Sequence, residues 1–508
     1  MKTLWILGNQ LNENLEGFEA IDPKGDIILF LECKDRSLWK NEHKQKLVLV
    51  FSAMRHFARK LKEKGYRVDY RNAENFPDGL KDHLADFSSQ EFLIHEPTDY
   101  RIKNLIEKEL VSRRNVRVKI LSEKPLFLVE KSEWESYLPE GKHWKQDDVY
   151  RKLRKERKIL LDASRPLGGR WSFDTENRKP PKKGLTFPEP PKFQPDKITR
   201  EVMKKVKIEY PDLFGDLENF SWPVTREEAL KALDHFMEYR LVTFGDYQDA
   251  MMEGNPWMSH SLLSGAINIG LLTPEETIKK VENVYHQGRV PLSTVEGFTR
   301  QILGWREYIR GVYLRKMPGY GEVNYFGHQN PLPSYYWTGE TNLNCISTAV
   351  KEVLKSGYNH HIQRLMVLGN WANLLRIRPQ EVSDWFLEAY VDSYDWVVLP
   401  NVLGMALYAD GGLISTKPYV SSGQYINRMS NYCFPCYFNI KEKVGEKACP
   451  FHALYWTFLE DHRALLEDNP RMKLMYANWD RQGKEQKKAL IIKGRELLDE
   501  AKKFPGYR

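Results

Sequence analysis

Four cysteines in the C-terminal half of the chain have the spacing of a metal site. Cys433 and Cys436 form a C-x2-C pair, which lets two thiolates face one metal centre, and Cys449 follows after twelve intervening residues. Cys345 is the fourth candidate ligand. This spacing is compatible with a zinc ion and with a [4Fe-4S] cluster alike, and zinc could recruit His452 in place of Cys345.

Two further segments offer polar side chains to a ligand. In residues 257–274, small hydroxyl residues precede a predicted helix, which suits a phosphate at the positive helix terminus. In residues 296–308, Gln301, Arg306 and Glu307 lie on an otherwise apolar helix. Buried polar side chains need partners, so this segment predicts either a polar ligand or salt bridges between helices.

The composition narrows the class of protein. The 508 residues contain 77 Lys and Arg against 69 Asp and Glu, a formal charge of +8 that does not by itself establish a nucleic-acid partner. A hydrophobic content of 41% excludes disordered and collagen-like chains, and five cysteines are too few for a disulfide framework. No stretch approaches the ~18 apolar residues of a membrane span, and the N-terminus turns polar too early for a signal peptide. We expect a cytoplasmic monomer without membrane contact, with Cys33 as a core thiol.

The elements that must position these residues follow from hydrophobic patterning. Short apolar runs that alternate with helical patterns predict a doubly wound α/β domain over residues 1–132, with a ligand at the carboxyl ends of its strands. The predicted helix covers residues 47–64, and the predicted strands cover residues 4–7, 27–31, 66–70, 92–95 and 118–121. Residues 133–200 are basic and proline-rich and predict a linker, whose charges are either solvated or contact DNA phosphates. Residues 201–508 predict a helical domain.

Several of these segments resemble the photolyase and cryptochrome family. Residues 264–270 are similar to its L-S-x-x-L-x-x-G signature, and residues 300–307 to its tryptophan-arginine-glutamate helix. His360, His361, Arg364, Asp392 and Asn401 follow in the family's order. The linker segment 168–178 and the four cysteines narrow the resemblance to the iron-sulfur bacterial subgroup, the prokaryotic (6-4) photolyases and their cryptochrome relatives. The resemblance covers the whole chain and implies a Rossmann-like antenna domain followed by a large all-α FAD-binding domain.

The resemblance implies two cofactors in the helical domain. Arg364 would pair with Asp392 beside the flavin ring, because a fixed cation stabilises an anionic reduced flavin. The implied FAD contacts are Tyr247, Ser261, Leu262, Leu263, Ser264, Gln301, Arg364, Asp392 and Asn401. A [4Fe-4S] cluster would bind Cys345, Cys433, Cys436 and Cys449 and staple the C-terminal helices, with electron transfer as the alternative role.

The 14 tryptophans, about twice an ordinary share, gain a candidate use from the resemblance. Four residues after Asn401, many family members have a tryptophan that reduces the flavin, whereas this chain has Met405, and a thioether does not readily replace indole as an electron donor. Trp385 and Trp337 match the donor positions of the iron-sulfur subgroup. Core packing is the alternative role for each.

The implied activity is light-driven repair of (6-4) pyrimidine-pyrimidone photoproducts in DNA by electron transfer from excited reduced FAD. His361 would supply the proton, because the pKa of histidine lies near neutrality, and Tyr419 and Tyr425 would line the lesion pocket. The lesion would be flipped out of UV-damaged DNA held by its backbone. The alternative is a blue-light photoreceptor with the same cofactors.

An antenna chromophore is implied for the N-terminal domain. In the iron-sulfur subgroup it is commonly 6,7-dimethyl-8-ribityllumazine. Gly8, Gln10 and Glu32 line the strand ends where it would bind.

Overall fold

The computed structural model describes residues 1–34, 42–111, 116–140 and 144–503. Its N-terminal part contains a parallel sheet with the strand order β3-β2-β1-β4-β5. The strands are β1 (Lys2–Trp5), β2 (Ile27–Cys33), β3 (Val68–Ala73), β4 (Glu91–His95) and β5 (Arg117–Leu121). The parallel sheet predicted from the sequence is therefore confirmed, and every strand end lies within three residues of its prediction. The strand order reverses between β1 and β4, where doubly wound sheets open a crevice at their carboxyl ends.

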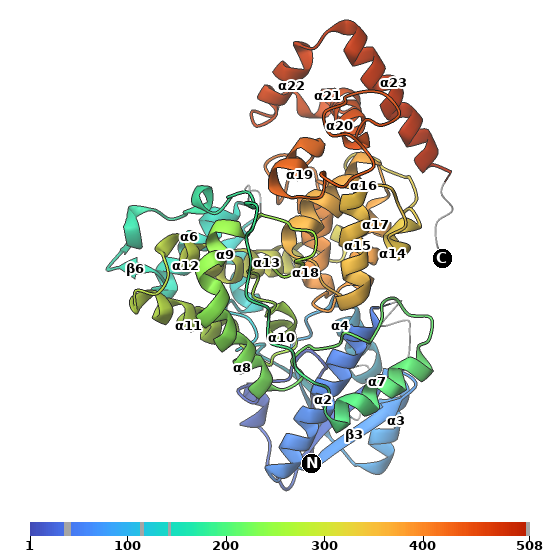
Figure 1. Ribbon diagram of the computed structural model, residues 1–508. Coiled ribbons are helices and arrows are strands. Elements are labelled where there is room, and N and C mark those ends of the chain that lie inside the picture. The colour runs from blue at the N-terminus through green and yellow to red at the C-terminus, as the bar shows by residue number, and fades with distance from the viewer. Residues whose placement is uncertain (35–41, 112–115, 141–143, 504–508) are drawn as a thin grey trace.

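The helix α2 (Lys44–Glu63) covers one face of the sheet and is buried along most of its length. The sequence predicted this helix over residues 47–64, and the structure begins it three residues earlier, with Gln45 and Lys46 buried in the added turn. Gln45 Nε2 donates to the carbonyls of Asp216 and Lys355, and Lys46 Nζ donates to Glu42 and Ser393, so the helical part of the chain covers this end of α2. Further along, α7 (Lys197–Glu209) packs against α2 (Figure 1). Two shorter helices, α3 (Phe76–Asp86) and α4 (Tyr100–Ile106), complete the crossovers.

The remainder of the described chain is helical, as the sequence predicted. The helices after α7 are α8 (Arg226–His235), α9 (Leu241–Tyr247), α10 (Ser264–Asn268), α11 (Pro274–His286), α12 (Leu292–Thr299), α13 (Glu307–Lys316), α14 (Tyr335–Thr338), α15 (Asn344–Ser356), α16 (Asn370–Leu374), α17 (Pro379–Ala389), α18 (Asp395–Leu399), α19 (Gly423–Met429), α20 (Pro450–Asp461), α21 (Arg463–Leu466), α22 (Lys473–Asp480) and α23 (Lys484–Ala501). The last two lie at the end of the molecule opposite the sheet (Figure 1). No helix in the described part of the chain is long and apolar enough to cross a membrane.

The basic connecting segment contains α5 (Trp134–Tyr137), α6 (Gln146–Arg157) and a short antiparallel pair, β6 (Leu161–Asp162) and β7 (Arg165–Pro166). Arg154 lies in its run of positive charges but is 1% exposed. Its guanidinium donates hydrogen bonds to the carbonyls of Ile159, Leu160 and Trp171. Part of this charge therefore holds the connection together and is not available to phosphates.

The sheet and the helices share one hydrophobic core, which runs from Leu4 to Ala501. Gly270 lies where the two parts touch. The N–H of Leu11 donates to the carbonyl of Ile269 at 2.9 Å, and a Cβ on Gly270 would lie 2.9 Å from the same nitrogen. Gly270 also has a φ of +90°, which favours glycine. The close approach of the two parts accounts for this glycine.

Candidate functional site

Asp392 joins three segments of the helical part. Its carboxylate accepts two hydrogen bonds from Arg364, at 3.0 and 3.2 Å, and one from Ser264 Oγ at 2.6 Å. Its carbonyl accepts from Asn268 Nδ2 at 2.7 Å. Burial opposes the positive charge of Arg364, yet the pair with Asp392 outweighs it and raises the arginine pKa above its ordinary value. The ion pair expected from the sequence is present, and it anchors the 261–264 segment beside it.

Residues expected to bind flavin lie in irregular helical turns. Gln301, Arg364 and Asn401 fall in three π-helical segments, η7 (Arg300–Arg306), η9 (Gln363–Gly369) and η10 (Pro400–Ala406). π-Helical turns occur frequently at functional sites, because they re-aim side chains within a helix. In this structure Gln301 donates weakly to the carbonyl of Gly297, at 3.4 Å, and Asn401 donates to that of Val397 at 2.8 Å.

The segment around Leu262 is strained. Leu262 has a φ of +62°, which non-glycine residues seldom adopt, and such strain clusters at ligand sites. The neighbouring helix α10 has only five residues, so its terminus offers little dipole to a phosphate. Tyr247, also expected near the flavin, packs edge-on against Phe187 with ring centroids 5.8 Å apart.

Arg240 is a buried cation that the sequence patterns did not single out. It is 1% exposed, and one of its nitrogens donates to the carbonyl of Ser261 at 3.1 Å. Its Nε and Nη1 atoms have no hydrogen-bond partner among the described residues. Burial lowers the pKa of Arg240 to about 10. A buried guanidinium with two open donors beside the 261–264 segment is suited to an anionic ligand group.

The polar residues of the 296–308 helix are largely satisfied within the protein. Arg306 donates to Asn268 Oδ1 at 2.7 Å, and its guanidinium lies 4.6 Å from the ring centroids of both Phe127 and Trp396. Glu307 Oε2 accepts the backbone N–H groups of residues 128 and 129. Arg306 Nε and Glu307 Oε1 have no hydrogen-bond partner among the described residues, so of the two interpretations left open by the sequence, internal pairing accounts for these side chains in part. They fasten the helical part to the sheet domain.

Three histidines gather near Asp249. The buried rings of His260 and His360 stack with centroids 4.5 Å apart and an angle of 6°, and His361 meets His260 edge-on at 5.5 Å. Burial, followed by the neighbouring histidines, lowers the pKa of His260 well below its usual value, and burial does the same for His360. His361 is half-exposed, and its Nε2 lies 3.3 Å from Asp249 Oδ1. The trio thus has two neutral inner rings and one outer ring beside a carboxylate.

The two tyrosines expected in the lesion pocket share electrostatic neighbours with His361. Burial raises the pKa of both Tyr419 and Tyr425, and Asp249 adds to the effect in each case. Arg178, from the connecting segment, acts on both in the opposite direction. Asp249 thus contacts His361 and acts electrostatically on both tyrosines. No sequence motif marked it.

Trp385 is fully buried on α17, one aromatic ring away from Arg364. Its ring packs edge-on against Tyr390 at 5.8 Å, and the guanidinium of Arg364 lies 3.9 Å from the centroid of Tyr390. Trp385 Nε1 donates to the carbonyl of Tyr336 at 2.9 Å, whereas the ring of the following residue, Trp337, packs edge-on against Phe214 at 5.4 Å. Tyr390 and Tyr336 were not foreseen, because single tyrosines in a helical sequence resemble core residues.

The four cysteines line one cavity. Its wall also includes Leu343, Gly423, Ile426, Tyr432, Phe438, Ile440 and Phe451. Burial raises the pKa of the Cys345 thiol well above its ordinary value, and the other three thiols raise it further. A Cβ on Gly423 would lie 2.8 Å from Cys449 Sγ, so glycine keeps this space open. The structure therefore brings together all four thiols that the spacing selected.

The alternative ligand His452 is otherwise engaged. Its Nε2 lies 2.9 Å from the carbonyl of Ile440, and His452 is not part of the cavity wall. A single metal ion needs donor atoms that lie close to one another. Within the described residues, such a group is the trio His260, His360 and His361, whose donor atoms lie within 4.8 Å of one another. The four thiols form no such group, so they suit a larger inorganic unit better than one zinc ion.

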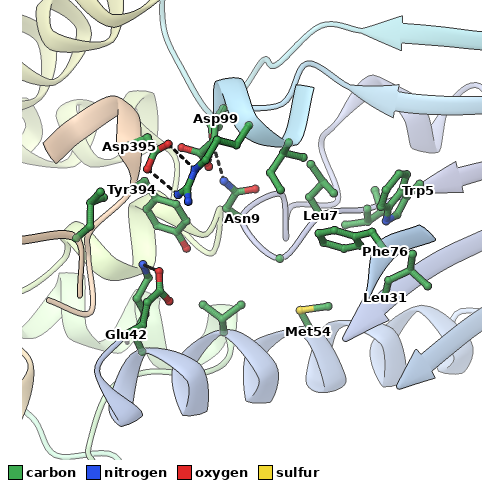
Figure 2. Close-up of a pocket in the computed structure, with 18 of the residues that line it drawn as sticks. Trp5, Leu7, Asn9, Leu31, Glu42, Met54, Phe76, Asp99, Tyr394 and Asp395 are labelled. Atoms are coloured by element: carbon green, nitrogen blue, oxygen red, sulfur yellow. Dashed lines mark hydrogen bonds and ion pairs between the residues drawn. The ribbon is translucent and has the colours of Figure 1, made fainter. Parts of the chain in front are cut away.

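A second cavity lies at the switch point of the sheet, between the sheet and the helical part (Figure 2). Figure 2 shows an apolar end formed by Trp5, Leu7, Leu31, Met54 and Phe76, and a polar end that carries Asn9, Glu42, Asp99, Tyr394 and Asp395. The cavity contains about 980 Å³ of space free of protein atoms, including the part open to solvent.

The polar end of this cavity, which we call the switch-point cavity, has unused hydrogen-bonding capacity. Arg101 binds Asp395 through two hydrogen bonds, at 2.9 and 3.0 Å. Glu42 Oε2, Asp99 Oδ1 and the hydroxyl of Tyr394 have no partner among the described residues. Burial and the nearby Asp395 carboxylate raise the pKa of Asp99 to about 6. Three buried, unpartnered polar atoms around one space indicate a polar ligand.

Of the three residues expected to bind an antenna, one lines the switch-point cavity and two lie outside its wall. Gly8 lines the switch-point cavity, where a Cβ would lie 2.9 Å from Val50 Cγ1. Gln10 and Glu32 are not part of its wall. Gln10 donates to the carbonyl of His95, and Glu32 accepts a bidentate pair of hydrogen bonds from Arg55. Glu32 follows the alternation of β2 to the opposite face of the sheet.

Comparisons with known proteins bear on the whole chain. A family model described as deoxyribodipyrimidine photo-lyase-related protein matches residues 4–222. A protein of Agrobacterium fabrum named (6-4) photolyase is 42% identical over 499 residues, which cover 97% of this chain and 98% of the relative. An uncharacterized protein of Acanthamoeba polyphaga mimivirus is 38% identical over 121 residues, which cover 24% of this chain and 89% of that protein.

The fold is that of a photolyase. The crystal structure of a bacterial class III photolyase from Agrobacterium tumefaciens superposes with a TM-score of 0.57, covering 98% of this chain and 96% of that one at 15% identity. This likeness concerns the fold alone. Because the Agrobacterium fabrum relative is similar over nearly its full length, the chain belongs to the photolyase family, in the branch of the (6-4) photolyases.

Proposed function

We propose that this protein repairs (6-4) photoproducts in DNA in a light-driven reaction. The observation that carries the proposal is the 42% identity, over 97% of the chain, to a protein named (6-4) photolyase. The contact of His361 with Asp249, whose charge also acts on Tyr419 and Tyr425, is compatible with it. The comparisons do not favour the alternative of a blue-light photoreceptor.

FAD is the proposed cofactor of the helical part. When bound, a reduced flavin supplies the electron that light drives into the lesion. We propose that the ring lies beside Arg364 and Asp392, with Ser264 and the strained 261–264 backbone as further contacts. The open donors of Arg240 fit a phosphate of the same cofactor. Tyr247, Gln301 and Asn401 complete the proposed contacts.

His361 is the proposed proton donor. Asp249 lies within hydrogen-bonding reach of its Nε2, and burial lowers the pKa of the neighbouring His260 and His360 well below the usual value. The half-exposed His361 can face a flipped base, and Tyr419 and Tyr425 would bound the space from the other side. The basic residues Lys417 and Arg428 lie beside these tyrosines in sequence and would contact DNA phosphates.

We propose Trp385 and Trp337 as the residues that would deliver electrons to a flavin bound beside Arg364. The contact of Trp385 with Tyr390, and of Tyr390 with Arg364, supports this route. Many family members have the tryptophan that reduces the flavin at the position that Met405 occupies here. Because methionine has no indole, this position cannot supply a tryptophan electron donor.

A [4Fe-4S] cluster is the proposed occupant of the thiol cavity, on Cys345, Cys433, Cys436 and Cys449. The cluster would tie the start of α15, the loop after α19 and the start of α20 together. The absence of a tight single-ion geometry among these four described thiols supports a cluster over zinc.

The switch-point cavity is the proposed site of the antenna, 6,7-dimethyl-8-ribityllumazine. Its apolar end fits a flat ring system, and the unpartnered oxygens of Glu42, Asp99 and Tyr394 fit the hydroxyls of a ribityl chain. We also propose the division into an antenna domain (1–132), a linker (133–200) and a helical catalytic domain (201–508). The cytoplasmic location and the monomeric state stay predictions.

The function is tested by illuminating the reduced protein with a duplex that contains one defined (6-4) photoproduct. We expect conversion to intact pyrimidines in the light and none in the dark. His361→Ala should bind the flavin normally and lose at least about 100-fold in repair rate, since a positioned general acid contributes that much. Failure of the wild-type protein to convert bound lesion would overturn the proposal.

The electron route is tested with Trp385→Phe. We expect photoreduction of the oxidised flavin to slow at least about tenfold, because the ring contact stays but the redox-active indole is lost. Repair by chemically reduced protein should be unchanged, and Trp134→Phe, at a buried tryptophan that packs against Tyr137, is the matched control. Equal photoreduction rates in the Trp385 variant and the wild type would refute the route.

A further inference from the structure

The thiol cavity and the histidine trio are connected by a continuous chain of buried polar contacts. On the cavity wall, Tyr432 is fully buried. Its hydroxyl accepts a hydrogen bond from Gln363 Nε2 at 2.9 Å. The Oε1 atom of the same Gln363 accepts the backbone N–H of His360 at 3.2 Å. One side chain thus bridges the cavity wall and the residue that precedes His361.

A second connection runs through α15, the helix that begins beside Cys345. Glu352 on this helix accepts from Gln363 Nε2 at 2.5 Å. At the start of the helix, Asn344 Nδ2 donates to the carbonyl of Tyr432 at 3.0 Å. Tyr432 is therefore held at both ends, by its carbonyl next to Cys433 and by its hydroxyl on Gln363.

A third set of contacts connects this turn with the ion pair of Arg364 and Asp392, beside the proposed flavin. The carbonyl of Asn359 accepts from Arg364 Nε at 2.8 Å, and its Oδ1 accepts from the hydroxyl of Tyr390 at 3.0 Å. Asn359 and Gln363 bracket the turn that carries His360 and His361. The backbone of this turn is thus fixed from the side of the thiol cavity and from the side of Arg364.

We propose that Tyr432 and Gln363 are positioning residues, through which an occupied thiol cavity holds the His361 turn in the geometry that receives a lesion. This inference rests on the proposed function and on an iron-sulfur cluster in the cavity. Thiol ligands bound to a rigid cluster would fix the position of the loop that carries Tyr432. The hydrogen bond between Tyr432 and Gln363 would then restrict the position of the Gln363 side chain. Buried side chains that satisfy one another's hydrogen bonds transmit such constraints, because loosening one leaves the others unpaired.

Coupling of this kind is reciprocal. If the occupied cavity favours lesion binding, lesion binding must stabilise the occupied cavity by the same free energy. The inference therefore predicts a property of the cluster itself that does not depend on repair activity.

The test measures iron in the dark on the purified holoprotein. Release of iron to a colorimetric chelator is followed with a saturating (6-4) lesion duplex, with an undamaged duplex and without DNA. We expect the lesion duplex to slow release about fivefold, the lower end of typical coupling, and the undamaged duplex to have little effect.

Tyr432→Phe removes one hydroxyl and keeps the ring on the cavity wall. We expect it to purify with full iron, to lose the protection by the lesion duplex and to bind the lesion about fivefold more weakly, with unchanged affinity for undamaged DNA. Tyr437→Phe is the matched control, because Tyr437 lies on the exposed side of the same loop, beside Lys447, and should behave as the wild type.

Gln363→Met is the second variant, and it should give the same losses. Because both residues belong to one link, the double variant should lose no more than either single variant. A wild-type protein that repairs lesions but shows no protection of iron, or a Tyr432→Phe variant with full protection, would overturn the link and leave the proposed function standing. A wild-type protein that does not repair the lesion overturns both.

Discussion

The two cavities of this protein differ in how their walls are drawn from the chain. The thiol cavity takes its four sulfur atoms from one residue type, and three of them fall within 17 residues, from Cys433 to Cys449. The switch-point cavity takes ordinary residues from the ends of β1, β2 and β4, from α2, and from the helices around Tyr394. The cysteine spacing reveals the thiol cavity in the sequence, whereas the switch-point cavity forms only where the sheet and the helical part pack together.

The difference extends to what each cavity would contribute to stability. Thiolates bind iron covalently, so loss of one ligand removes the cluster and the order of the loop around it. The switch-point cavity belongs to a shared hydrophobic core that is closed by many other contacts. We therefore expect the thiol cavity to respond to substitution with loss of structure and the switch-point cavity with loss of a ligand.

The largest effect is expected for Cys433→Ser. It should purify without stoichiometric iron and with a free energy of unfolding lowered by at least about 3 kcal/mol, since loss of a metal site belongs to the most damaging changes. Iron assay, visible absorption and chemical denaturation measure this.

The matched control is Cys33→Ala, which removes a buried thiol from β2, away from the cavity. It should retain iron and lose only about 1 kcal/mol. Full iron in Cys433→Ser, or equal iron loss in Cys33→Ala, would contradict the assignment of the cavity.

An intermediate effect is expected for Asp99→Asn in the switch-point cavity. Replacing the carboxylate, whose Oδ1 has no partner among the described residues, should weaken lumazine binding about tenfold, the value of one hydrogen bond to a charged group, and leave iron content unchanged. Fluorescence titration of lumazine-free protein measures the affinity.

Asp86→Asn, at an exposed aspartate that pairs with Arg71, is the control and should bind lumazine normally. If Asp99→Asn bound lumazine as tightly as the wild type, the ribityl chain would not lie at this end of the cavity.

The smallest effect concerns pH. The pKa of Asp99 is raised to about 6 in the folded protein, so between about pH 4 and pH 6 the folded chain holds a proton that the unfolded chain has lost. The contribution of Asp99 to the free energy of unfolding therefore falls as the pH rises through this window. In lumazine-free protein, the wild type should lose about 1 kcal/mol relative to Asp99→Asn between pH 5 and pH 7.5, measured by urea unfolding. A difference that stays constant with pH would show that Asp99 is ionised throughout.

The sequence predictions were most accurate for features that depend on interactions between residues close together in the chain. The five strands and the helical remainder were predicted correctly, because side-chain periodicity reports burial locally. The pair of Arg364 and Asp392 and the grouping of the four thiols were anticipated through the family resemblance. The polar residues of the 296–308 helix illustrate the limit, since the sequence left open whether they bind a ligand or one another.

Several functional candidates carried no signal that one sequence could reveal. Arg240, Asp249 and Tyr390 lie in no motif, and each gains its meaning from a neighbour distant in the chain. Glu32 illustrates the reverse case, because it lies near the end of β2 in the correct sheet, but its side chain points to the opposite face, toward Arg55. A shift of one residue along a strand exchanges the two faces, and only the register of the sheet decides between them.

The sequence by itself determined the class of each element, the candidate thiol ligands and the membership of a family, because these depend on residue types and on local spacing. The tertiary structure decided which polar residues are satisfied within the protein and which stay open to a ligand. It also decided that Tyr432 and Gln363 lie between the thiol cavity and the His361 turn. Hydrogen-bond satisfaction is a property of neighbours in space, and folding alone brings together residues that lie about seventy positions apart in the chain.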